Sequence, residues 1–171
     1  MKTYLDWKIK KTKLKGVIQI TPSEFKDIRG SYVEIYNKEF YDKKKLKINF
    51  IQDDISISKL NVLRGIHGDQ KTWKLISCLY GKFQLIVLNN DPKSKEYGKW
   101  QSFVLSSKNR VQILVPPRFG NGHLVLSKKA IFHYKQNTQY DRSSQFTIKW
   151  NDPRFKFKWK KKKPILSVRD K

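Results

Sequence analysis

The chain has 171 residues, of which 38 are Lys or Arg and 14 are Asp or Glu, so its formal net charge is +24 at pH 7. An aromatic content of 13% argues against disorder, no apolar run is long enough to span a membrane, and the first residues lack the apolar core of a signal peptide. A length of 171 residues predicts one domain over residues 1–171. The lone Cys78 cannot form an internal disulfide, so we expect a cytoplasmic protein, and the lack of a long apolar run predicts no membrane partner.

Short runs with strand patterns follow one another along the chain, and one short, charged helix is expected near residues 37–46. Residues 51–58 alternate between isoleucine and polar side chains, which is the period of a half-buried strand. The runs 74–79 and 83–88 flank Tyr80-Gly81-Lys82 and predict a hairpin. The other predicted strands are 17–20, 31–36, 100–105, 111–115, 123–126 and 131–136, and residues from 150 onward look irregular. About ten short strands with little helix favour an antiparallel jelly roll.

Strand alternation also predicts which side chains point inward. Lys74 shares a face with Ile76 and Cys78, which indicates that it faces the interior. Strict alternation would place Arg64 and His67 on opposite faces, but the intervening Gly65 predicts a bulge that brings both toward one cavity.

Lysine is spread over most of the chain, and the densest run covers residues 158–163. Such a run can bind nucleic acid or anionic lipid, but lysine also fills ordinary solvated positions. The even spread favours solvated positions, so we expect no nucleic-acid partner. The positive field would still attract an anionic substrate.

Four polar residues could carry acid–base chemistry if the fold brings them together: His67, Lys74, Tyr134 and Asp170. A histidine titrates near neutrality and can remove a proton at working pH, and a cation can stabilise an enolate oxygen. Each residue also has an ordinary alternative, as a core histidine, a surface lysine, a core tyrosine or a solvated terminus. Taken singly, these residues leave both interpretations open.

Short motifs in a fixed order favour the functional interpretation. They include Phe25-Lys26-Asp27-Ile28-Arg29-Gly30, Arg64-Gly65-Ile66-His67, Lys74-Leu75, Trp150-Asn151-Asp152-Pro153 and Leu166-Ser167-Val168-Arg169-Asp170. From about Phe25 to Asp170 the chain resembles the dTDP-4-dehydrorhamnose 3,5-epimerase family and its relatives acting on other nucleotide-linked 4-keto sugars. The resemblance implies an all-β, cupin-type jelly roll (a double-stranded β-helix) with few short helices. It also implies a homodimer, a nucleotide-diphosphate sugar as substrate and no cofactor.

The resemblance assigns a role to each of the four residues. His67 is the base that removes a proton beside a ketone, and Asp170 orients its imidazole. Tyr134 returns a proton to the opposite face, and Lys74 stabilises the enolate. Substrate-binding positions implied in the same way are Arg29, Glu34, Gln52, Asp54, Arg64, Asn121, Tyr140 and Gln145.

No metal site is expected. Many cupins bind a metal through a His-x-His pair with a later Glu and His, whereas this chain has only His67, His123 and His133. It also lacks a Gly-rich phosphate loop, which argues against bound ATP or a dinucleotide.

Several positions depart from the family pattern. The usual aromatic and Gln after the catalytic histidine become Gly68 and Asp69, and the lost bulk at Gly68 predicts room for a larger sugar. The usual Gly-Phe-Ala-His-Gly-Phe becomes Arg118-Phe119-Gly120-Asn121-Gly122-His123, so Asn121 replaces an active-site histidine. Asp54 in place of Asn and Gln145 in place of Glu suggest a different base on the nucleotide. The pattern is similar to epimerases for GDP-linked 4-keto-6-deoxy-heptoses in capsular or surface-polysaccharide biosynthesis.

Four alternatives stay open. One is a dTDP-4-keto-6-deoxyhexose 3,5-epimerase of the dTDP-L-rhamnose pathway. A second is an epimerase acting at C3 alone, since Asn121 cannot relay a proton as a histidine can. A third is a 3,4-ketoisomerase, although that group tends to carry a second histidine where this chain has Asp69. The fourth is a basic, non-catalytic jelly roll that binds sugar or nucleic acid.

Overall fold

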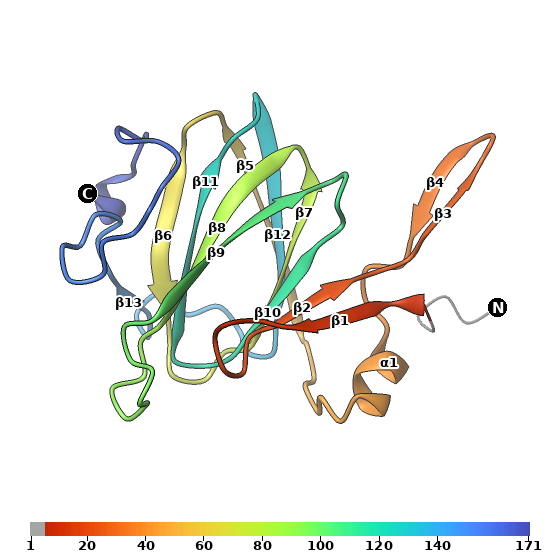
Figure 1. Cartoon of the computed structure of the whole chain (residues 1–171), viewed down its shortest axis with the longest axis horizontal. Helices are drawn as coiled ribbons and strands as arrows, with labels where there is room; N and C mark the ends of the chain where they lie inside the picture. The colour runs from red at the N-terminus through yellow and green to blue at the C-terminus, as the bar shows by residue number, and fades with distance from the viewer. Residues whose placement is uncertain (1–5) are drawn as a thin grey trace.

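The computed structural model describes residues 6–171, which form two antiparallel sheets that face each other (Figure 1). The larger sheet has six strands in the order β1-β2-β10-β7-β12-β5, and the smaller has five in the order β13-β6-β11-β8-β9. The elements are β1 (Lys8–Lys11), β2 (Ile18–Thr21), β3 (Glu24–Asp27), β4 (Gly30–Val33), α1 (Lys38–Lys43), β5 (Gln52–Lys59), β6 (Leu63–Gly68), β7 (Lys74–Tyr80), β8 (Lys82–Asn89), β9 (Trp100–Ser106), β10 (Gln112–Val115), β11 (Phe119–Val125), β12 (Lys129–Gln136), β13 (Phe146–Thr147) and the 3-10 turn η2 (Val168–Asp170). This strand order confirms the predicted all-β jelly roll.

The main core lies between the two sheets and contains Ile76 of β7, Leu85 of β8 and Phe103 of β9. Strand β8 is buried along its whole length after Lys82, because apolar side chains from the C-terminal part of the chain pack on its outer side. A strand covered on both faces requires a continuous apolar run, which explains the sequence Leu-Ile-Val-Leu within it.

Strand β5 is an edge strand with an unusual orientation. Its isoleucines face outward, and Ile55 and Ile57 are 59% and 58% exposed. The polar residues that alternate with these isoleucines face inward, and Ser58 among them is buried. The predicted strand is therefore confirmed, while its polar face lines the interior.

The predicted hairpin around Tyr80-Gly81-Lys82 is wrong. Strand β7 pairs with β10 and β12, whereas β8 pairs with β9 and β11 in the other sheet. Gly81 therefore marks a corner at which the chain crosses between sheets. Strands β1, β3, β6 and β13 were not among the predicted strands. The predicted helix is confirmed in shorter form as α1, which the Asn37 side chain caps by accepting a bond from Phe40 N at 3.1 Å.

The predicted irregularity at Gly65 is confirmed. Gly65 has a φ of +110°, and the pairing of β6 with β11 shifts register between Asn121 and His123. A Cβ at this position would lie 2.6 Å from the Cα of Gly122, so only glycine fits without displacing the neighbouring strand. The shift brings Arg64 and His67 to the same cavity.

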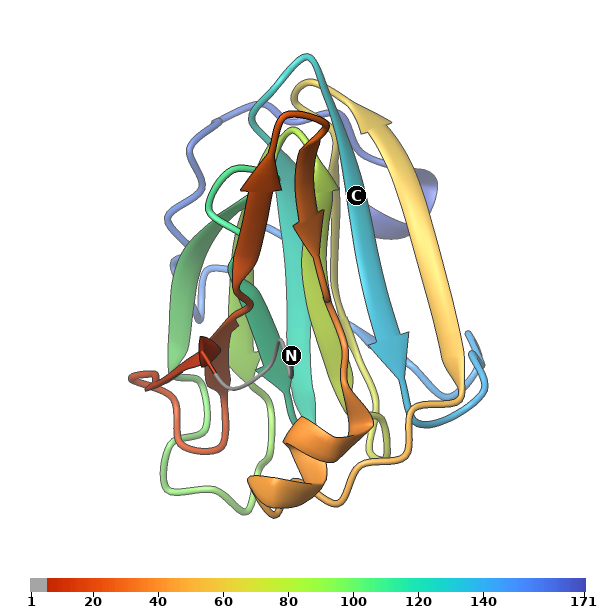
Figure 2. The ribbon, with the colours of Figure 1, turned by 90° about the vertical axis from the view of Figure 1, so that its right-hand side faces the viewer.

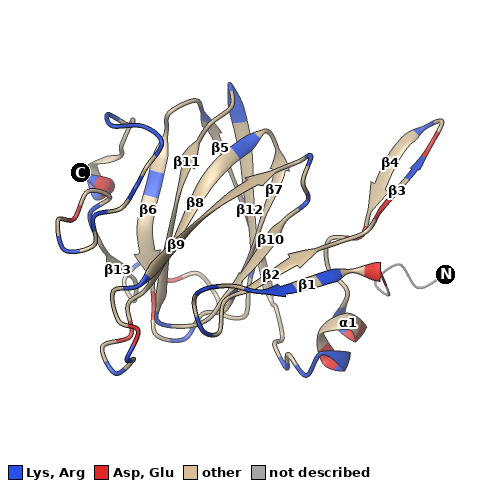
Figure 3. Ribbon diagram, viewed as in Figure 1, with Lys and Arg blue, Asp and Glu red and all other residues tan. Residues whose placement is uncertain are grey.

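The β3–β4 hairpin projects away from both sheets, on the side opposite the C-terminal turn η2 (Figure 1, Figure 2). Lys and Arg residues occur on strands, loops and the C-terminal segment alike (Figure 3). Among residues 6–171, no helix is long and apolar enough to cross a membrane.

Candidate active site

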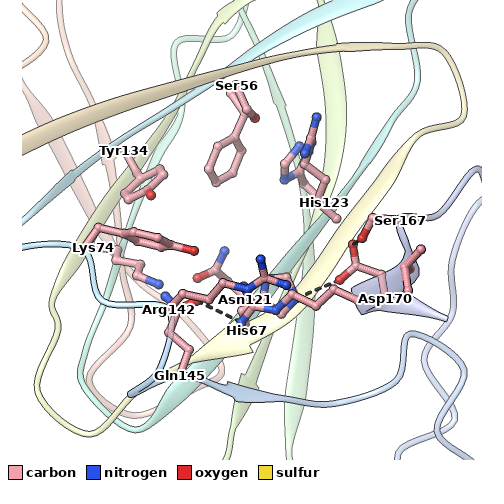
Figure 4. Close-up of a pocket in the computed structure, with 15 residues that line it drawn as sticks. Ser56, His67, Lys74, Asn121, His123, Tyr134, Arg142, Gln145, Ser167 and Asp170 are labelled. Carbon is pink, nitrogen blue, oxygen red and sulfur yellow. Dashed lines mark hydrogen bonds and ion pairs between the residues drawn. The ribbon is translucent and has the colours of Figure 1, made fainter.

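A cavity of about 450 Å³ opens among strands β5, β6, β7, β11 and β12, and the C-terminal segment closes one side of it (Figure 4). The volume falls in the range of pockets that hold small ligands, roughly 300–1,000 Å³. Each strand contributes inward-facing polar side chains to the wall, so the jelly roll has an unusually polar interior at this point.

His67 and Asp170 form a close side-chain contact in the cavity. The Nε2 atom of His67 lies 2.7 Å from Oδ1 of Asp170, whose side chain is 3% exposed. Asp170 also accepts hydrogen bonds from Ser167 Oγ at 2.8 Å and from Gly65 N at 3.3 Å. Burial acts to raise the pKa of Asp170, but the hydrogen bonds from His67 and Ser167 hold the pKa below its ordinary value. An ionised Asp170 favours the imidazole tautomer with its proton on Nε2, which leaves the lone pair on Nδ1.

Tyr134 of β12 and Lys74 of β7 lie together across the cavity from His67 (Figure 4). The ammonium of Lys74 lies 5.8 Å from the centre of the Tyr134 ring. Burial lowers the pKa of Lys74, and the negative charge of Asp69 partly opposes this effect. Burial and the nearby Asp54 carboxylate raise the pKa of Tyr134, so its phenol stays protonated and can act as a donor.

Most of the predicted site residues line this one cavity. They are His67, Lys74, Tyr134, Asp170, Arg64, Asn121, Tyr140 and Gln145. Gln52 and Asp54 do not line the cavity but bond to each other next to it. Gln52 donates to Asp54 Oδ2 at 2.8 Å and accepts from Tyr140 N at 2.7 Å. These two residues therefore support the position of Tyr140 and Tyr134 from outside the cavity wall.

Arg29 and Glu34, which were also predicted to bind substrate, do not line this cavity within the chain. Arg29 lies at the tip of the β3–β4 hairpin, where its side chain is 85% exposed and forms an ion pair with Asp27 at 2.6 Å. Glu34 follows the same hairpin and accepts a hydrogen bond from Asn37 Nδ2 at 2.9 Å. The hairpin projects away from both sheets (Figure 1), so the substrate-binding role of these two residues stays a prediction.

The expected space beside Gly68 is also absent. A Cβ at Gly68 would lie 2.2 Å from the carbonyl oxygen of Phe119 and 2.5 Å from the ring of Phe146, so the neighbouring strand and ring already fill this volume. The adjacent Asp69 closes the turn after β6, since its Oδ1 accepts from Lys71 N at 2.9 Å and Thr72 N at 2.7 Å. Neither departure from the motif enlarges the cavity.

Several cavity residues were not predicted: Ser56, His123, Phe132, Arg142, Ser167, Val168 and Arg169. Arg169 donates to Gln145 Oε1 at 3.1 Å, which places a second cation near the exposed Arg142 at the rim. The altered motif at residues 118–123 was the available signal for His123. The loop and terminal residues carried no periodic pattern from which their position could be read.

A carboxylate-supported imidazole, a neutral phenol and a buried ammonium in one jelly-roll cavity are the groups that an isomerase needs to move a proton beside a carbonyl group. Comparison with known proteins agrees, because residues 11–171 match the family model described as dTDP-4-dehydrorhamnose 3,5-epimerase. The chain belongs to the dTDP-4-dehydrorhamnose 3,5-epimerase family, and it is an epimerase acting on nucleotide sugars.

Individual relatives cover nearly the whole chain. The dTDP-4-dehydrorhamnose 3,5-epimerase of Salmonella typhimurium is 34% identical over 94% of this chain and 90% of its own length. The Legionella pneumophila enzyme, solved in complex with dTDP-4-keto-L-rhamnose, is 31% identical, covers 96% of this chain and 89% of its own, and has a TM-score of 0.92. The Elizabethkingia anophelis enzyme is 35% identical, covers 96% and 93%, and has a TM-score of 0.88.

Proposed function

We propose that this protein inverts C3, and also C5, of a nucleotide-diphosphate-linked 4-keto-6-deoxy sugar by deprotonation and reprotonation through an enolate. The observation that carries the proposal is the 2.7 Å contact between His67 and Asp170 in the cavity that also holds Tyr134 and Lys74. A base supported by a buried carboxylate and an acid on the far wall are the two groups that inversion requires.

The proposed sequence of proton transfers follows from these positions. The 4-ketone acidifies the C–H bonds at C3 and C5, and Nδ1 of His67 removes one such proton. The electron pair of the C–H bond moves into the ring, and the negative charge collects on the former carbonyl oxygen, near the ammonium of Lys74. Tyr134 then delivers a proton to the opposite face of the carbon. Its neutral phenol and its position across the cavity support this role.

The sugar nucleotide is best assigned as a dTDP-linked 4-keto-6-deoxyhexose, as in the dTDP-L-rhamnose pathway. The relatives named above support this assignment, and the filled space at Gly68 removes one reason for expecting a larger sugar. A GDP-linked 4-keto-6-deoxy-heptose of a capsular pathway is the second candidate. It is favoured by Asp54 and Gln145 near Tyr140, and by polar atoms in the cavity that have no partner among residues 6–171.

Asn121 is the residue that affects whether the sugar is inverted at C3 alone or at both C3 and C5. It lies opposite His67 in the β6–β11 pairing, and its buried Oδ1 has no hydrogen-bond partner within residues 6–171. An amide can hold a sugar oxygen but cannot relay a proton, so inversion at C3 alone is the alternative outcome for the same site.

We also propose a homodimer in which the β3–β4 hairpin of each protomer reaches the cavity of its partner. This arrangement would bring the exposed Arg29 to the substrate's diphosphate, which arginine can hold through two hydrogen bonds. The outward-facing Ile55 and Ile57 of the β5 edge offer apolar surface for such an interface. We place the protein, as one domain, in the cytoplasm, consistent with its single, buried Cys78.

The proposal is tested by incubating the protein in heavy water with dTDP-4-keto-6-deoxyglucose and, separately, with a GDP-linked 4-keto-6-deoxy-heptose. Deuterium at C3 and C5 of one sugar is the expected result, and faster incorporation into one substrate identifies the nucleotide sugar. Deuterium at C3 alone would indicate a 3-epimerase, and ketone migration would indicate a 3,4-ketoisomerase. Absence of exchange, with salt-sensitive binding to nucleic acid, would indicate a non-catalytic binding protein.

A further inference from the structure

The cavity has two levels along its strands. At the first level, Asn121 of β11 lies opposite His67 of β6 in the strand pairing, and Tyr134 and Lys74 line the cavity across from His67. At the second level, the same strands place His123 opposite Arg64. Residues two apart on a strand point the same way and lie roughly 7 Å apart, which is about the width of a sugar ring. When the reacting sugar ring lies at the first level beside His67, the second level is one ring width away. A ligand group there is attached to the reacting ring and is not the reacting carbon itself.

The second level contains two polar atoms that the protein does not use. His123 is 4% exposed, and its buried Nε2 has no hydrogen-bond partner among residues 6–171. Ser56 of β5 also lines the cavity with a buried Oγ that lacks a partner in the same part of the chain. Buried polar atoms are nearly always hydrogen-bonded in native proteins, so two of them facing one cavity indicate a polar ligand there.

The packing around His123 does not require a nitrogen. Its ring stacks on Phe132 with centroids 4.1 Å apart and an angle of 9° between the planes. The usual motif has phenylalanine at this position, and a phenyl ring would stack equally well. The distinctive contribution of histidine is therefore its nitrogen, which points to recognition of a ligand oxygen.

Proton transfer is not the role of this residue. Burial lowers the pKa of His123 to about 3, and the positive charge of Arg64 acts in the same direction. The imidazole thus stays neutral at working pH and offers one donor and one acceptor, as a hydroxyl does.

We propose that His123 and Ser56 are specificity-determining residues that hydrogen-bond an oxygen of the group attached to the reacting sugar ring. This inference rests on the proposed function. Two substrate groups supply the same chemistry: the phosphate on the anomeric carbon, which Arg64 would also contact, and a hydroxyl on a sugar substituent. In both cases the chain holds a polar group where a phenylalanine would present only carbon.

The test uses His123→Phe, which keeps the stacked ring, and Ser56→Ala as an independent probe of the same level. Ser107→Ala, on the wall of a different depression at the end of the barrel, is the matched control. For each protein, kcat/KM is measured on dTDP-4-keto-6-deoxyglucose and the GDP-linked heptose, and Kd is measured for dTDP and GDP without a sugar. The pH profile of kcat/KM is recorded as well.

Both second-level variants should lose about 5- to 50-fold, the effect expected for removing one partner of a buried hydrogen bond, with a pH profile of unchanged shape. A loss in Kd for the free diphosphates identifies a phosphate oxygen. A loss in kcat/KM on either sugar nucleotide, with unchanged Kd for the free diphosphates, identifies a sugar hydroxyl. Wild-type values of both Kd and kcat/KM in His123→Phe and Ser56→Ala would overturn the inference, as would a shifted pH profile.

Failure of the proposed function has a different signature. If the wild-type protein exchanges no sugar hydrogen with solvent, the epimerase proposal fails, whereas the nucleoside diphosphate measurements still report on His123. If His123→Phe does not fold, Ser56→Ala carries the comparison alone.

Discussion

The penultimate residue, Asp170, places its carboxylate 2.7 Å from Nε2 of His67, and so the end of the chain completes a site built on the strands. The turn η2 holds this position through the hydrogen bond from Ser167 to Asp170 and through the contact with Gly65 N. Loss of Asp170 should therefore affect chemistry without affecting the core between the sheets.

Deletion of residues 170–171, or the substitution Asp170→Asn, should lower turnover by about a hundredfold or more, because the imidazole loses the carboxylate that fixes its tautomer. The fold should survive, since Asp170 packs at the edge of the cavity. Solvent deuterium exchange measures the first effect, and circular dichroism with thermal unfolding measures the second. Full activity in the truncated protein would remove Asp170 from the mechanism.

Tyr134→Phe should separate the two halves of the reaction. His67 would still remove the substrate proton, so exchange with solvent should continue, but delivery of a proton to the far face should fall by about 100-fold. Nuclear magnetic resonance of the sugar in heavy water distinguishes exchange with retention from inversion. Inversion at the wild-type rate in this variant would contradict the assigned role.

The alkaline limit of activity should depend on Lys74. Burial lowers its pKa, so the ammonium becomes neutral at a lower pH than an exposed lysine, whose pKa is about 10.4. As pH rises through this lowered pKa, the enolate loses its cation and kcat should decline. Lys74→Arg, which stays charged, should extend the profile to higher pH, and Lys74→Met should lower kcat at every pH. An identical alkaline limit in wild type and Lys74→Arg would argue against this role.

A mixed dimer tests whether Arg29 acts in the partner's site. Arg29→Ala leaves His67 intact, and His67→Asn leaves the hairpin intact, so each homodimer should have low activity. If the hairpin acts across the dimer, a mixed dimer regains one complete site and should show about half of wild-type activity per dimer. Activity no greater than the mean of the two parents would indicate that the hairpin does not cross over. Light scattering checks the oligomeric state of each preparation.

Gly65→Ala should destabilise the protein by about 3 kcal/mol or more, because it combines a positive φ with a Cβ 2.6 Å from Gly122 Cα. Gly30→Ala is the matched control, since Gly30 also has a positive φ but no atom within 4 Å of the added Cβ. It should cost only about 1 kcal/mol. Equal losses in denaturant unfolding would show that crowding at Gly65 is unimportant.

Much of this architecture was predictable from local pattern. Alternation identified β5 and the inward position of Lys74, and the glycine between Arg64 and His67 indicated the irregularity that unites them. The crossing at Gly81 was not predictable, because a tight turn between two apolar runs is equally compatible with one sheet or two. The outward isoleucines of β5 reverse the usual orientation, since the polar side of the strand lines the cavity.

The position of each site residue relative to the cavity was the hardest feature to predict. Arg29 carries a family motif, but a motif does not show on which side of the molecule a hairpin projects. His123 was missed because its burial and stacking on Phe132 are those of a core aromatic residue, and only the three-dimensional pairing with Arg64 places its nitrogen at a site.

Removal of a carbon-bound proton next to the ketone by His67 can be measured directly. Wild-type protein and His67→Asn are incubated at saturating 4-keto sugar in heavy water, and deuterium at C3 is followed by nuclear magnetic resonance. We expect incorporation by the wild-type protein and a loss of about 1,000-fold or more in the folded variant. Incorporation at the wild-type rate by His67→Asn would contradict the account.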